Sequence, residues 1–92
     1  MGCNMTKQSK WLFEGDDSQW SLLGYTERRL LEETGLTVIM VPHQWNNTVS
    51  LSVFEPHPDG DVLLVDKYFS RWSIDSATDW LAKLINDYAS WN

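Results

Sequence analysis

Three short stretches rich in valine, isoleucine and threonine follow one another between Leu36 and Phe69, and an amphipathic stretch comes after them. They cover residues 36–45, 48–55 and 62–69, with turn-forming residues between them. β-branched residues bounded by turns are typical of strands, and closely spaced strands pair as antiparallel hairpins. The pattern predicts an α+β fold: an N-terminal helical segment, a three-stranded antiparallel meander in the order 1-2-3, and a C-terminal helix packed on one sheet face.

The first turn of the meander is expected at Asn46-Asn47. Asparagine tolerates the positive φ angles that a two-residue hairpin turn requires. Such a turn would pair Trp45 with Thr48 and, further along, Ile39 with Phe54. The register of the first two strands depends on this turn.

The second turn is expected at residues 58–60, where proline presets one dihedral angle and glycine takes the left-handed position. It would pair Phe54 with Leu64 and Ser50 with Tyr68. The middle strand would then lie between two partners.

The spacing of apolar residues in the last part of the chain predicts an amphipathic helix. Ser73, Asp75 or Ser76 is expected to open it, since each is a common N-cap residue. Its apolar side chains recur at helical spacing on one face: Ala77, Trp80, Leu81, Leu84, Ile85, Tyr88 and Trp91. A face of this kind requires burial, so we expect it to pack across the sheet.

The segment before residue 25 admits two interpretations. Trp11 to Glu14 could form a short strand that extends or covers the sheet, or a helix could begin at Asp16, Asp17 or Ser18 and run onward. On a helical wheel one arc is mostly apolar but includes one acid: Trp20, Leu23, Glu27, Leu30, Leu31 and Thr34.

Residues 26–34 are predicted to be helical under either interpretation. Thr26 is the expected N-cap and Gly35 the expected residue after the last turn. Gly24 weakens a longer helix, because glycine is a poor helix former.

Alternation along the strands divides their side chains between two faces. The face expected to receive the C-terminal helix is almost wholly apolar: Val38, Met40, Pro42, Val49, Leu51, Val53, Leu63, Val65 and Phe69. The second face is about half apolar, with Ser50, Ser52 and Asp66 among its apolar residues. A solvated sheet face would be mostly polar, so we expect something to cover this one.

The N-terminal segment with Trp11, Phe13 and Trp20, another protein chain, or a ligand could cover the second face. Exposed apolar patches with polar rims mark interaction sites. We therefore predict a small, acidic, non-enzymatic protein-interaction module of a binding, inhibitory or chaperone-like kind. It is expected to form a homodimer at micromolar concentration, with Trp45 as the anchor, or to bind a protein partner. The alternative is a small-molecule-binding domain with a pocket on this face. The predicted interaction surface consists of Ile39, Val41, His43, Trp45, Phe54, Leu64 and Tyr68.

Two groups of residues could carry chemistry. His43, Ser50 and Asp66 have the residue types of a hydrolase triad and fall on neighbouring strands of the second face, but no nucleophile elbow or oxyanion loop accompanies them. The turn at residues 57–61 holds one histidine and two aspartates, fewer ligands than a calcium loop or a zinc site requires. We interpret both groups as ordinary sheet and turn residues and predict no catalytic residue, cofactor or metal.

The formal net charge of −6 would repel a phosphate backbone, so we expect no nucleic-acid partner. No apolar run approaches the roughly 20 residues of a membrane span. The single cysteine excludes an intrachain disulfide and favours a reducing compartment, so a cytoplasmic location is expected.

Residues 1–9 are predicted to form a flexible leader, and residues 10–92 a single domain. Gly2 and Thr6 match the N-myristoylation pattern, with Cys3 placed for palmitoylation. The alternative is an unmodified polar leader. Membrane attachment is expected only if Gly2 is lipidated.

Overall fold

The computed structural model describes residues 12–91, with side chains described for residues 12–88. Its elements are α2 (Asp17–Thr34), β1 (Thr37–His43), β2 (Thr48–Glu55), β3 (Val62–Ser70) and α3 (Ile74–Trp91). The strands form one antiparallel sheet in the order β1-β2-β3, which confirms the predicted α+β fold. The predictions for the leader, for lipidation at Gly2 and Cys3, and for Trp11 lie outside the described residues.

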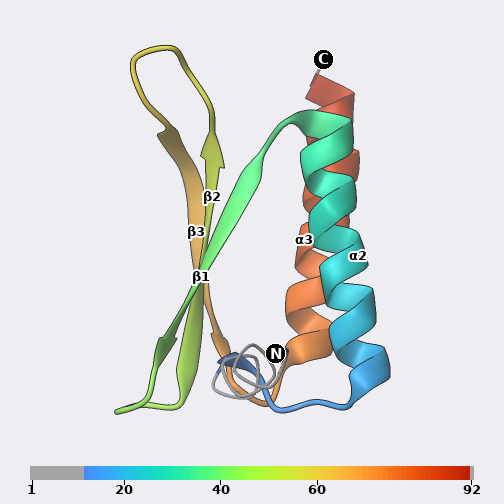
Figure 1. The fold of residues 1–92 in the computed structure, drawn as a ribbon, viewed down its shortest axis with the longest axis vertical. Coiled ribbons are helices and arrows are strands. Elements are labelled where there is room, and N and C mark those ends of the chain that lie inside the picture. The colour runs from blue at the N-terminus through green and yellow to red at the C-terminus, as the bar shows by residue number, and fades with distance from the viewer. Residues whose placement is uncertain (1–11, 92) are drawn as a thin grey trace, which may run out of the picture.

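The protein has two layers, with the sheet on one side and both helices on the other (Figure 1). α2 and α3 lie side by side and run in the same direction (Figure 1). They are parallel because three strands return the chain to the end of the sheet where α2 begins. Neither of the two described helices is long and apolar enough to cross a membrane.

α2 begins at Asp17, well before the segment 26–34 that was predicted to be helical under either interpretation, and it runs without interruption to Thr34. Asp16 caps it: its carboxylate accepts from the Gln19 N–H at 3.0 Å, and the Gln19 side chain accepts from the Asp16 N–H at 3.0 Å. The bond from the Gln19 backbone is the main reason that the pKa of Asp16 is lowered. The prediction that Thr26 is the N-cap is therefore wrong. Thr26 is buried inside α2, and its hydroxyl donates to the Leu22 carbonyl at 2.8 Å. One capping box at Asp16 supplies the start signal, and helix continues through Gly24.

Gly24, inside α2, and Gly35, which follows its last residue, make a matched pair for a stability measurement. A Cβ atom added at Gly24 or at Gly35 would meet no atom within 4 Å, but only Gly35 has a positive φ, of 78°. Gly24→Ala is therefore expected to raise the free energy of unfolding by about 0.5 to 1 kcal/mol, because alanine is the better helix former. Gly35→Ala should lower it by about 1 kcal/mol, because alanine is strained in the left-handed conformation. Urea denaturation followed by circular dichroism measures both; a stabilised Gly35→Ala variant would contradict the helix end described here.

The first hairpin differs from its predicted register by two residues. His43 pairs with Thr48 and Val41 with Ser50, so the loop spans four residues, 44–47, in place of two. Only Asn47 takes a positive φ, of 56°. Because the shift is even, every side chain of β1 keeps its predicted face while its cross-strand partner changes.

The second hairpin confirms the turn and part of the register. The Gly60 N–H donates to the His57 carbonyl at 3.0 Å, and Ser50 pairs with Tyr68 as predicted. A bulge between Val53 and Phe54 then shifts the register, so that Phe54 lies opposite Leu63 and not opposite Leu64. A bulge adds a residue to one strand and alters which side chains share a face.

The core lies between the sheet and the two helices and includes Phe13. It is formed by Phe13, Leu23, Leu30, Leu36, Val49, Leu51, Val53, Phe69, Ile74, Ala77, Leu81 and Ile85. The Phe13 ring is fully buried and its centroid lies 6.1 Å from that of Trp20. Phe13 and Trp20 therefore pack in the core, which excludes them as the cover for the opposite face of the sheet. The first interpretation, a short strand at Trp11–Glu14, is wrong for the described residues 12–14: Leu12 is helical, and Phe13 and Glu14 form neither helix nor strand.

Arg71 joins the chain before α2 to the sheet. The Glu14 N–H donates to the Arg71 carbonyl, and the Arg71 N–H donates to the Asn47 carbonyl at 2.9 Å. The Arg71 guanidinium also pairs with the Glu14 carboxylate. These bonds hold Phe13 in place beside the end of β3.

Candidate functional site

We define the outer face of the sheet as the face turned away from α2 and α3. Neither helix covers it (Figure 1). Its apolar side chains are exposed: Tyr68 to 60%, Ile39 to 54%, and Trp45, in the first hairpin loop, to 83%. Val41 is also exposed, while His43 and Phe54 are partly buried. Six of the seven residues predicted to form the interaction surface thus lie on the outer face or at its end.

A cluster of rings organises one end of the outer face. The ring of His43 lies 5.4 Å from that of Tyr68 and 6.2 Å from that of Trp45, measured between centroids. The Nε2 atom of His43 lies 3.2 Å from the buried hydroxyl of Ser50. The three rings therefore form a contiguous aromatic surface that extends from the first hairpin loop over β1 to β3.

Leu64 does not belong to the outer face. It lines a cavity of about 240 Å³ on the helix side, together with Leu36, Val53, Val65, Leu84 and Tyr88. The bulge is the reason, because it places Leu63, and not Leu64, opposite Phe54. Leu63 is exposed and takes the place predicted for Leu64, since paired residues point to the same face.

Tyr88, one of the residues that line this cavity, also forms a hydrogen bond to the sheet. The Tyr88 hydroxyl donates to the Glu55 carboxylate at 2.6 Å and joins α3 to the end of β2. This bond, followed by the contact with His57, holds the pKa of Glu55 below its usual range. The bond to Tyr88 requires that α3 lie against this end of the sheet.

The predicted group of His43, Ser50 and Asp66 is only partly brought together. His43 and Ser50 are in contact, as described above, although their strands pair in a different register from the one predicted. Asp66 is exposed and lies opposite Ser52, one position further along the sheet on this face. Among residues 12–88, no group of three His, Cys, Asp or Glu side chains lies close enough to hold a metal ion.

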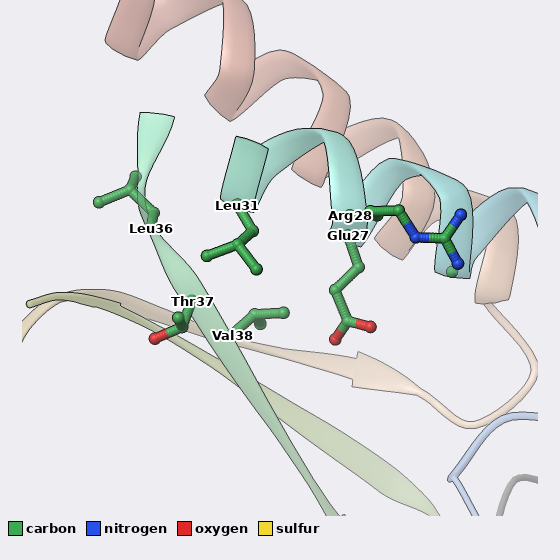
Figure 2. Close-up of a pocket in the computed structure, with 7 residues that line it drawn as sticks. Glu27, Arg28, Leu31, Leu36, Thr37 and Val38 are labelled. Atoms are coloured by element: carbon green, nitrogen blue, oxygen red, sulfur yellow. The ribbon is translucent and has the colours of Figure 1, made fainter. Parts of the chain in front are cut away.

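A second concave surface lies between α2 and β1, and sequence reasoning missed it. This groove has a volume of about 410 Å³ and is lined by Gly24, Glu27, Arg28, Leu31, Leu36, Thr37 and Val38. In Figure 2, Glu27 and Leu31 extend from α2 toward β1, whereas the guanidinium of Arg28 extends along the helix away from the Glu27 carboxylate. The one available signal was the presence of Glu27 within the apolar arc of α2.

Burial raises the pKa of Glu27 above the usual glutamate value. A raised pKa means that the folded protein holds this proton more tightly than the unfolded chain, so Glu27 lowers stability as the pH rises through the glutamate range. Glu27→Gln is expected to raise the free energy of unfolding at pH 7, and the gain should vanish toward about pH 4, where glutamate is protonated. The same change at exposed Glu32 serves as the control for net charge. Equal gains from both variants in urea denaturation at pH 7 and pH 4 would contradict this prediction.

Comparisons with known proteins identify no relative. The scan against protein-family models matched no family. The searches of curated proteins and of solved structures found no match.

Proposed function

We propose that this protein is a small protein-interaction module that forms a homodimer through the outer face of its sheet. The observation that supports the proposal is the exposure of Tyr68, Ile39 and Trp45 on one side of the molecule. Aromatic side chains are enriched at protein interfaces and dominate their energetics. A sheet face with this composition favours a binding role.

The distribution of charge favours a second copy of the chain as the partner. Within the three strands, Asp66 is the one acidic residue on the outer face, and Lys67 points to the opposite side because it pairs with the buried Leu51. The chain as a whole carries a net charge of −6, so surfaces outside this face repel each other. Self-association is thereby restricted to the outer face, where a two-fold axis would bring two identical surfaces together.

The size of the face sets the expected affinity. Three strands about 4.8 Å apart and about 25 Å long give a footprint on the order of 400 Å². Stable interfaces bury about 800 Å² per partner, so a dimer formed here lies at the weak end of the range. We expect a dissociation constant in the micromolar range.

In this proposal the protein acts by binding and not by catalysis. The contact between His43 and Ser50 then has a structural role, because it orients the imidazole ring between Tyr68 and Trp45. A fixed ring loses less conformational entropy on binding than a free one.

Sedimentation velocity over about 1 to 100 μM tests the proposal. We expect the weight-average sedimentation coefficient to rise from the monomer value toward the dimer value over this range, as mass action requires for a micromolar dissociation constant. A single monomeric species at ~100 μM would overturn the proposed homodimer.

A further inference from the structure

We propose that the groove between α2 and β1 binds an organic cation with an aliphatic body, whose ammonium group pairs with Glu27 while the body lies against Leu31 and Val38. The groove is separate from the outer face, so the inference does not depend on the proposed dimer. Two sources could supply this chemistry: a free alkylamine, or the side chain of a lysine in a polypeptide.

The groove has the volume and the lining of a site for a small amphipathic molecule. Its volume of about 410 Å³ lies within the range of small-molecule pockets, roughly 300 to 1,000 Å³. Leu31, Leu36 and Val38 supply apolar walls, and the carboxylate of Glu27 extends between the helix and the strand (Figure 2). Apolar walls with one placed charge fit an amphipathic ligand of the opposite charge.

The carboxylate of Glu27 has no partner among the described residues. Among the described residues, Glu27 makes no hydrogen bond or ion pair, whereas Glu33 on the exposed side of the same helix pairs with Arg29 at 2.8 Å. The neighbouring cation, Arg28, extends away from Glu27 (Figure 2). A half-buried carboxylate without a partner is unfavourable in the folded chain, and a bound cation would remove this penalty.

Gly24, a residue of α2, lines the groove. A glycine inside a helix is unfavourable, and no neighbouring atom requires one here, because an added Cβ atom would meet nothing within 4 Å. Any side chain at this position would extend into open space beside the groove. The absence of a side chain at Gly24 leaves this side of the groove open to a ligand.

The test is a titration of the full ¹⁵N-labelled chain with n-hexylamine, followed by two-dimensional NMR. We expect saturable shifts centred on the amides of Gly24, Leu31 and Val38. Hexan-1-ol, which has the same body without the charge, should bind at least about tenfold more weakly, because it cannot form an ion pair with the Glu27 carboxylate. A titration with Nα-acetyl-lysine methylamide distinguishes the sources: comparable or tighter binding assigns the groove to a lysine side chain, and weaker binding assigns it to a free amine.

Two variants and one control complete the test. Glu27→Gln should weaken hexylamine binding at least about tenfold, whereas Glu32→Gln, which removes the same charge from an exposed position, should change it less than about twofold. Gly24→Leu retains the carboxylate but fills space beside the groove and should also weaken binding. Because Glu27→Gln is expected to be at least as stable as the wild type, loss of folding would not account for its effect. The absence of saturable shifts, or equal losses in the Glu27→Gln and Glu32→Gln variants, would overturn the inference.

Discussion

Replacing Phe13 with alanine is expected to lower the free energy of unfolding by about 3 to 5 kcal/mol. Phe13 is fully buried and packs in the same core as Leu51 and Leu81, although it precedes α2 and belongs to no regular element. Removing its ring would leave a cavity that the surrounding side chains cannot fill. A domain of this size is stable by only about 5 to 15 kcal/mol, so this loss is a large fraction of its total stability.

Urea denaturation monitored by far-UV circular dichroism measures this loss. Trp45→Ala is the control, because it removes a larger aromatic ring from a position that is 83% exposed. That control should change the stability by no more than about 0.5 kcal/mol. A loss below about 1 kcal/mol for Phe13→Ala would show that the segment before α2 is not part of the core.

Replacing Tyr68 with glutamate is expected to raise the dissociation constant of the proposed dimer by at least about 30-fold. Tyr68 lies in the aromatic cluster of the outer face, where its ring contacts His43. A glutamate there removes the ring and places a charge in a surface that would be desolvated on association. Trp45→Glu, at the end of the same cluster, should act in the same direction.

The chain offers a closely matched control in Tyr25. It is 56% exposed, against 60% for Tyr68, but it lies on α2 in the other layer of the protein. Tyr25→Glu introduces the same charge and should leave the sedimentation behaviour unchanged. Both variants should retain the far-UV circular dichroism of the wild type. Equal dissociation in the two variants would mean that general charge repulsion, and not the outer face, governs self-association.

The sheet and α3 were predictable because local patterns encode them. Period-two alternation in residues 48–55 and the turn at residues 57–60 define the central strand and its second partner. Helical spacing from Ala77 to Tyr88 defines the buried face of α3. These signals depend on neighbours in the sequence, so they remain visible before the chain folds.

The details of the outer face were less predictable. The length of the first loop depends on how His43 pairs with Thr48, and the bulge depends on how β3 bends beside Phe54. No residue type near Leu64 marks the bulge. One predicted surface residue therefore moved to the helix side, while the others kept their face.

Sequence patterns alone determined the α+β class, the strand order and the apolar faces of β1 and β2, because hydrophobic periodicity and turn chemistry are properties of adjacent residues. The tertiary structure alone decided that Phe13 enters the core, that the outer face has no cover among the described residues, and that Glu27 faces a groove beside β1. Each of these depends on how segments far apart in the chain compete for the same apolar surface. Which side chains are buried depends on the packing of the whole molecule, so it cannot be read from the pattern of neighbouring residues.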